Sequence, residues 1–263
     1  FPMHGDQPEN LLQRSKSACA LARYRTDRIA NAEDDSEGRV ESQLLGENRL
    51  RTAVMEDALE LVFQPQYDLR RGQIMGAECL LLSNEPSLGM VTAEDAYSAA
   101  ESAGVVSGFV SSILNRALRN VSEFRYSGGL DLRIGIKLPS RALLNTELPD
   151  VVQRALGTWS RRAGTLILEI GGTSLLREDA VARETLLRLR EIGVKLSIDD
   201  SEMALTTLYW LAALPFQEIK IDVSMAPDLA GVPKSERITQ SVIELAHHLK
   251  LNIVAVGVAD EVQ

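Results

Sequence analysis

The sequence contains little cysteine and no long apolar run. Only Cys19 and Cys79 occur among the 263 residues, and they do not form a CxxC pair. Neither a disulfide framework nor a zinc site is therefore indicated. No apolar stretch approaches the roughly 18 residues that cross a bilayer, and residues 1–12 have neither the basic nor the apolar part of a signal peptide. We expect a cytoplasmic protein with no membrane segment within this chain.

Basic residues are also fewer than acidic residues. The chain carries 28 Lys and Arg against 37 Asp and Glu, a net charge of −9. A polymeric nucleic acid is not expected as a partner, because binding it needs a broad basic surface. A small anionic ligand remains compatible with this charge if a bound metal neutralises it. No glycine-rich phosphate loop of the Rossmann or Walker type is present, which counts against open-sheet nucleotide-binding folds.

The order of predicted elements indicates an α/β fold. Residues 60–69 and 72–82 form two strand-like runs joined by a polar turn, which predicts a hairpin. From Leu130 onward, strands and helices alternate, which predicts parallel strands with helical crossovers. Seven strands are predicted in all. A modified TIM (β/α)8 barrel fits best, with a doubly wound open sheet as the alternative. One barrel strand is lacking because the sequence stops at Gln263, so we expect the C-terminal part of the barrel to be missing.

The first 50 residues differ in pattern from the rest of the chain. Residues 8–23 carry apolar positions at roughly helical spacing, and residues 31–38 form an acidic, polar stretch that resembles a linker. A further helical pattern covers residues 39–59. The sequence therefore predicts a helical linker before the barrel.

Acidic residues stand at or near the ends of several predicted strands. Because barrel enzymes place their chemistry at the carboxyl ends of strands, we expect these side chains to converge: Glu78, Glu169, Asp199, Asp200 and Asp222. Converging carboxylates suit Mg²⁺ or Mn²⁺, and the usual chemistry of such a site is hydrolysis of a phosphate ester. Lys220 lies two residues before Asp222 and is predicted to point to the same side of its strand.

Each of these residues also has a simpler interpretation. Asp200 alone is typical of a helix N-cap, and Glu78 alone is typical of a polar residue at a sheet edge. Lys220 alone is typical of a surface lysine or of a partner for Asp222. Only their combination on several strands favours a metal site.

The motifs resemble those of the EAL domain family, the cyclic-di-GMP phosphodiesterase domains of bacterial signalling. The resemblance holds in order through FQPQYDL, GAECLLL, KLP, LEIGG, IDDSEMA, LPFQEIKID and VAVGVADEVQ. It implies an EAL domain over residues 59–263, with a barrel whose first strand is antiparallel. Residues 31–58 are then a linker and helix. Residues 1–30 resemble the C-terminal end of a GGDEF (diguanylate cyclase-like) domain.

The resemblance also implies roles for individual residues. It assigns metal ligation to Glu78, Glu169, Asp199 and Asp200, catalysis to Lys220, and ligand contacts to Gln64, Pro65 and Asp222. Several family positions are altered. Leu82 replaces a phosphate-binding arginine, Lys137 an asparagine metal ligand, and Gly172 a loop-anchoring glutamate. Ser201-Glu202-Met203-Ala204 replaces a Phe-Gly-Thr-Gly loop, and Val256 and Ala259 replace two glutamates.

These departures predict a degenerate domain whose metal ligands and lysine are vestigial. We expect no catalytic activity and a regulatory role through a protein partner or self-association, with no cofactor. The alternatives are a receptor that binds cyclic-di-GMP without cleaving it, and a weak phosphodiesterase that uses Mg²⁺ or Mn²⁺. We further hypothesise that Lys137 lies among Glu78, Glu169 and Asp199 and neutralises them in place of a metal.

Overall fold

The structure, a computed structural model, describes seven segments of the chain: residues 36–85, 88–129, 131–159, 163–171, 179–199, 214–222 and 233–258. The chain divides into two compact units, Phe1–Leu50 and Arg51–Gln263. Helix α2 (Ser36–Met55) begins inside the stretch predicted as a linker. The helical pattern predicted at 8–23 lies outside the described residues, as does all but the last residue of the one predicted at 206–214.

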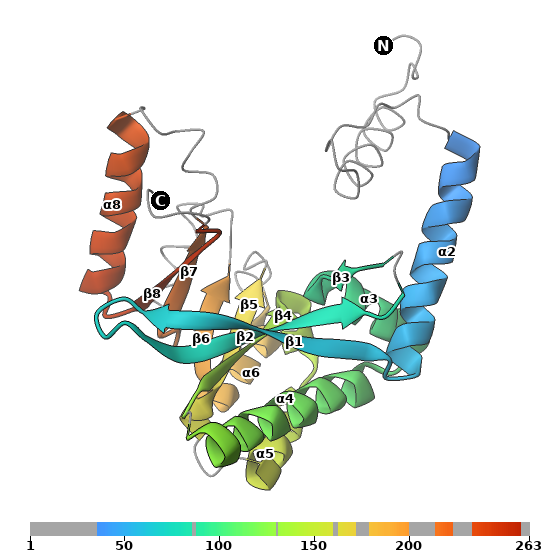
Figure 1. The fold of residues 1–263 in the computed structure, drawn as a ribbon, viewed down its shortest axis with the longest axis horizontal. Coiled ribbons are helices and arrows are strands. Elements are labelled where there is room, and N and C mark those ends of the chain that lie inside the picture. The colour runs from blue at the N-terminus through green and yellow to red at the C-terminus, as the bar shows by residue number, and fades with distance from the viewer. Residues whose placement is uncertain are drawn as a thin grey trace. The chain divides into compact units, whose positions relative to one another are not determined.

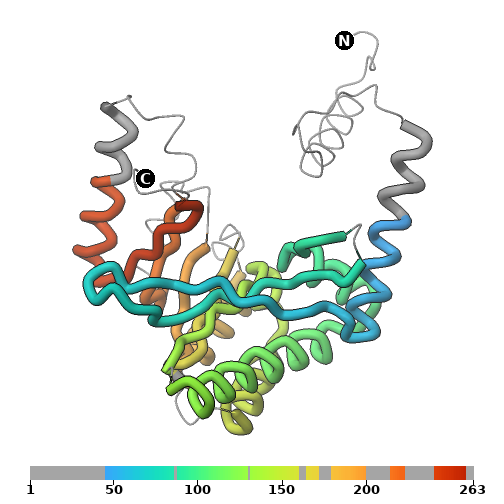
Figure 2. The backbone as a smooth tube through the Cα atoms, viewed as in Figure 1, coloured from blue at the N-terminus to red at the C-terminus, as the bar shows by residue number. Residues whose placement is uncertain are grey.

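The predicted hairpin follows α2 in the second unit. Strands β1 (Leu59–Asp68) and β2 (Gln73–Ser83) pair in antiparallel fashion and run side by side along their length (Figure 2). The Asp68 carboxylate closes the turn by accepting hydrogen bonds from the backbone N–H groups of Arg70 and Arg71. Gly72 completes it at φ 63°, a conformation that suits glycine.

Strands then alternate with helices. Parallel pairing joins β2 to β4 (Arg133–Pro139), and continues through β5 (Leu166–Gly171), β6 (Lys195–Asp199), β7 (Glu218–Asp222) and β8 (Asn252–Val256). The helices are α3 (Ala93–Ala103), α4 (Val106–Gly128), α5 (Leu148–Trp159), α6 (Ala180–Glu191) and α8 (Pro233–His248), with short 3-10 turns η1 (Ser140–Leu144) and η2 (Ala163–Thr165). None of these helices is both long and apolar enough to span a membrane.

Helix ends follow local capping rules. Thr92 begins α3 by accepting a hydrogen bond from the backbone N–H of Asp95, and Gly104 ends it in the left-handed region. Asp179 caps α6 by accepting from the N–H groups of Val181 and Ala182. These side chains satisfy backbone groups that a helix leaves unpaired at its termini.

The sheet curls, with β1 and β8 as the two ends of its path (Figure 1). This confirms the α/β, barrel-like fold with an antiparallel first pair. A short strand that was not predicted, β3 (Met90–Val91), pairs with β2. Two residues are too few to show a period, which explains why the sequence pattern missed it.

The strands of the barrel wall separate an apolar face from a polar one. Leu168 and Ile170 of β5, and Leu196 and Ile198 of β6, are fully buried in the core. Glu169 lies between Leu168 and Ile170 in β5 and therefore points to the other face of the sheet, because successive side chains of a strand alternate between its faces. The polar face of adjacent strands thus carries the acids and lysines of the candidate site.

Candidate functional site

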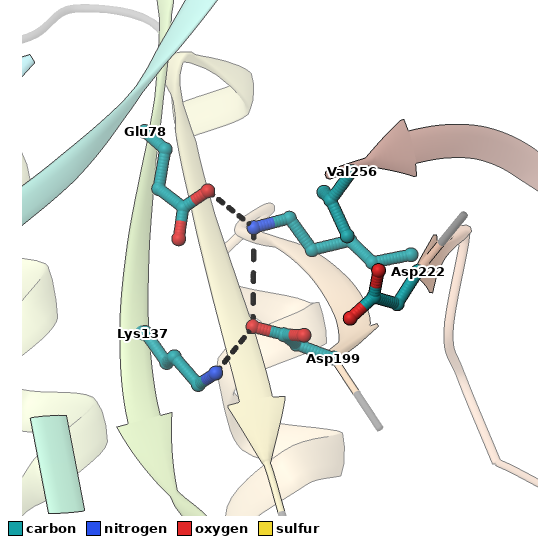
Figure 3. A pocket seen from close by; sticks show the side chains of 6 residues that line it. Glu78, Lys137, Asp199, Asp222 and Val256 are labelled. Atoms are coloured by element: carbon teal, nitrogen blue, oxygen red, sulfur yellow. Dashed lines mark hydrogen bonds and ion pairs between the residues drawn. The ribbon is translucent and has the colours of Figure 1, made fainter. Parts of the chain in front are cut away.

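Five adjacent strands, β2, β4, β5, β6 and β7, bring their polar side chains together on the inner face of the sheet. A pocket of about 290 Å³ is lined by Glu78 of β2, Lys137 of β4, Asp199 of β6, Lys220 and Asp222 of β7, and Val256 of β8 (Figure 3). Oxygen atoms of Glu78, Glu169 and Asp199 lie within 4.8 Å of one another. The structure therefore brings together three of the four predicted metal ligands.

Lys220 is the centre of this cluster. Its Nζ lies 2.7 Å from Glu78 Oε2, 2.5 Å from Glu169 Oε2 and 3.9 Å from Asp199 Oδ2. Only 2% of its side chain is exposed. Burial alone would lower the pKa of Lys220, but the Glu169 and Glu78 carboxylates outweigh it and the pKa is raised. The Lys220 ammonium therefore stays charged and holds β2, β5, β6 and β7 together.

Lys137 approaches the cluster from β4. Its Nζ lies 2.8 Å from Asp199 Oδ2, and 43% of its side chain is exposed. Lys137 thus points toward the acids, as hypothesised, and its ion pair is with Asp199. Glu78 and Glu169 pair with Lys220 instead.

Glu169 is the most deeply buried acid of the cluster, with no exposed surface. Its Oε1 atom has no hydrogen-bond partner and lies over Gly135 of β4, where an added Cβ would come within 2.1 Å of it. Gly135 was not among the predicted site residues. A glycine inside a strand is the signal that could have identified this close approach.

The remaining predicted residues have different positions. Gln64 is exposed on β1, paired in register with Glu78. Leu82 lies further along β2, half-buried and opposite Met90 of β3. Asp222 lines the pocket and is itself exposed. Asp200, Gly172, the segment 201–204 and Ala259 lie outside the described residues.

The cluster suits a divalent cation by ligand type but not by charge. Three carboxylates are the hard oxygen ligands that Mg²⁺ and Mn²⁺ prefer, and the unpartnered Glu169 Oε1 is a further free oxygen. However, each acid already contacts an ammonium group through one oxygen. As the residues stand, two lysines supply the positive charge that a metal would bring.

The buried carboxyl of Glu169 gives a pH prediction. Burial raises its pKa from 4.5 to about 8, helped by the charges of Glu78 and Asp199 and opposed by Lys220. A carboxyl whose folded pKa lies above its unfolded pKa stabilises the fold fully at low pH, and this contribution is lost as the pH rises. With EDTA present, we expect the free energy of unfolding to fall between about pH 4.5 and about pH 8.

Urea unfolding at a series of pH values measures this trend. Glu169→Gln should show a flatter dependence over the same range, because the titrating group is gone. An equal slope in the wild type and in Glu169→Gln would contradict the assignment to Glu169.

Comparisons with known proteins agree with this geometry. The EAL domain family matches residues 47–263. The cyclic di-GMP phosphodiesterase NbdA of Pseudomonas aeruginosa is 31% identical over 261 residues, covering 98% of this chain and 33% of NbdA. An uncharacterized protein of Mycobacterium tuberculosis is 30% identical over 258 residues, covering 97% of this chain and 41% of that protein. The chain therefore spans less than half the length of these curated relatives.

A solved structure has a similar fold. The PaMucR phosphodiesterase in its c-di-GMP complex matches with a TM-score of 0.72 at 30% identity, over 84% of this chain and 88% of that one. The fold and the family match point to one conclusion. This chain belongs to the EAL domain family of cyclic-di-GMP signalling proteins.

Proposed function

We propose that this EAL domain has lost phosphodiester hydrolysis and acts as a regulatory, protein-interaction module in cyclic-di-GMP signalling. The observation that carries the proposal is the charge of its site. Lys220 and Lys137 already contact the three clustered acids, Glu78, Glu169 and Asp199. Hydrolysis of a phosphodiester at such a site relies on bound metal ions to polarise the phosphoryl group and to activate water.

Electrostatics supports this proposal. Two unit charges about 4 Å apart interact by about 4 kcal/mol at an effective dielectric of roughly 20, and about 1.4 kcal/mol corresponds to a tenfold change in affinity. Solvent screening reduces this figure for Lys137, whose side chain is 43% exposed. Even a fraction of the repulsion weakens the binding of a divalent ion substantially.

The apolar residues of the site support it as well. Val256 lines the pocket opposite Lys137 and offers no ligand atom. Leu82 on β2 offers no charge to a phosphate group. Hydrolysis would therefore have to proceed without a carboxylate at 256 and without a guanidinium at 82.

A second candidate is a receptor that binds cyclic-di-GMP without cleaving it. The pocket retains Asp222, and the PaMucR domain of the same fold is a c-di-GMP complex. A third is a weak phosphodiesterase dependent on Mg²⁺ or Mn²⁺, favoured by the cyclic di-GMP phosphodiesterase NbdA among its relatives.

One experiment separates the three. The chain is mixed with cyclic-di-GMP and Mg²⁺ or Mn²⁺, and both ligand binding and linear pGpG are measured, with NbdA as the positive control. We expect neither binding nor product. Binding without product would select the receptor, and pGpG would select the enzyme.

Restoring the altered positions should bring binding back. We expect the triple variant Lys137→Asn, Val256→Glu, Leu82→Arg to bind Mn²⁺ or cyclic-di-GMP measurably, because it removes the competing cation and adds a carboxylate and a guanidinium. Isothermal titration calorimetry measures this gain. The matched control places the glutamate at the exposed Val258 instead of Val256. A folded triple variant that binds no better than this control would contradict the chemical argument.

A further inference from the structure

We infer that the Lys137 ammonium group takes the place of a divalent ion beside Asp199 and thereby prevents the acid cluster from binding a metal ion. The inference deepens the proposed function and rests on it, because it names the residue that keeps the site from recruiting metal. It assigns Lys137 and Lys220 different tasks within one cluster.

The geometry separates these tasks. Lys220 is buried and bridges Glu78 and Glu169 at 2.7 and 2.5 Å, so its ammonium is part of the structural core of the site. Lys137 contacts Asp199 at 2.8 Å from the neighbouring side of the pocket. Figure 3 shows Lys137 reaching Asp199 from its own strand, and Lys220 of β7 comes within 3.9 Å of the same aspartate.

Strand register explains why Lys137 reaches this position. Lys137 of β4 pairs with Glu169 of β5, so both side chains lie on the polar face at the same level. Asp199 follows on β6, two residues beyond Ser197, which is the register partner of Glu169. A lysine side chain is long enough to reach past Glu169 to that aspartate. A shorter polar residue at 137 would leave Asp199 Oδ2 without this contact.

The net charge of the cluster shows how the contact between Lys137 and Asp199 opposes the binding of a metal ion. The three acids and two lysines leave one net negative charge when all five are ionised. A divalent ion added to these five groups would give them a net charge of +1, which is unfavourable for partly buried groups, and the exposed Asp222 that also lines the pocket offsets it only through solvent screening. Without Lys137, the same ion would leave the cluster neutral. Removal of the Lys137 ammonium therefore makes room for a metal charge and leaves the buried Lys220 in place.

The exposure of Lys137 makes the inference testable. Its side chain is 43% exposed, whereas that of Lys220 is 2% exposed. Replacing Lys137 with methionine keeps the length of the side chain and removes only a partly solvated charge. We expect Lys137→Met to remain folded, whereas the same change at Lys220 removes a buried partner.

The experiment titrates the whole chain with Mn²⁺ alone, by calorimetry and by electron paramagnetic resonance of free Mn²⁺. We expect Lys137→Met to bind Mn²⁺ at least about tenfold more tightly than the wild type, a difference of about 1.4 kcal/mol. Lys250→Met, which changes an exposed lysine outside the site, should behave as the wild type. Adding Asp199→Asn to Lys137→Met should abolish the gain and so locate the ion.

Two results would overturn the inference. One is tight wild-type Mn²⁺ binding that Lys137→Met does not improve. The other is a folded Lys137→Met variant, verified by circular dichroism, with no gain. Either result leaves the proposed function standing if the wild type releases no pGpG. Release of pGpG by the wild type refutes the proposed function instead, so the two failures are distinguishable.

Discussion

Lys220→Met is expected to lower the free energy of unfolding by about 3–5 kcal/mol, the usual effect of breaking a buried ion pair. The Lys220 ammonium is the shared partner of Glu78 and Glu169, and its side chain is 2% exposed. Methionine fills a similar volume but leaves those carboxyl groups without a cation. Urea unfolding followed by circular dichroism above the Glu169 pKa of about 8, in EDTA, measures the loss.

A double-mutant cycle tests the cause. Glu169→Gln combined with Lys220→Met should recover a large part of the lost stability, because the buried carboxylate that needs the ammonium is gone. The effect of Lys220→Met should also shrink as the pH falls below about 8, because the Glu169 carboxyl takes up a proton there. If the double variant is as unstable as the sum of the two single variants, the ion pair is not what stabilises the site.

Gly135→Ala is expected to destabilise the fold by about 1–3 kcal/mol, the range for overpacking a filled interior. The new Cβ would lie 2.1 Å from Glu169 Oε1 and 2.9 Å from its Cδ. A flexible side chain could move aside, but Glu169 is fully buried and is held by Lys220 at its other oxygen. The midpoint of urea unfolding reports the effect.

A matched glycine provides the control. Gly157 lies in α5, and an added Cβ there meets no atom within 4 Å. Gly157→Ala is therefore expected to be neutral or to stabilise by up to about 1 kcal/mol, since alanine is the better helix former. In a Glu169→Ala background, the effect of Gly135→Ala should largely disappear. Equal losses from Gly135→Ala with and without Glu169 would show that the contact is not the cause.

The architecture was largely predictable because it depends on local patterns. Two strand-like runs around a polar turn predicted the β1–β2 hairpin, and the strand–helix alternation after Leu130 predicted the parallel sheet. Both patterns reflect the burial of one face of each element, which the order of apolar residues records. The two-residue β3 was missed because its pairing with β2 depends on tertiary contact.

The site was predictable in its members but not in its pairings. Acids at the ends of neighbouring parallel strands must converge, so the grouping of Glu78, Glu169 and Asp199 could be predicted from strand positions alone. Which lysine contacts which acid could not, because side chains from β4 and β7 compete for the same carboxylates. Lys137 was hypothesised to lie among all three acids, whereas it is Lys220 that reaches all three.

By itself, the sequence determined the family resemblance, the order of strands and helices, and the acids that share a strand end. Those properties follow from the type and spacing of residues along the chain. Only the tertiary structure decided that Lys220 is buried between Glu78 and Glu169, that Lys137 holds Asp199, and that Glu169 needs a glycine at 135. The physical reason is that these contacts depend on strand register and on side-chain reach across the inner face of the sheet, and neither is recorded in the local pattern.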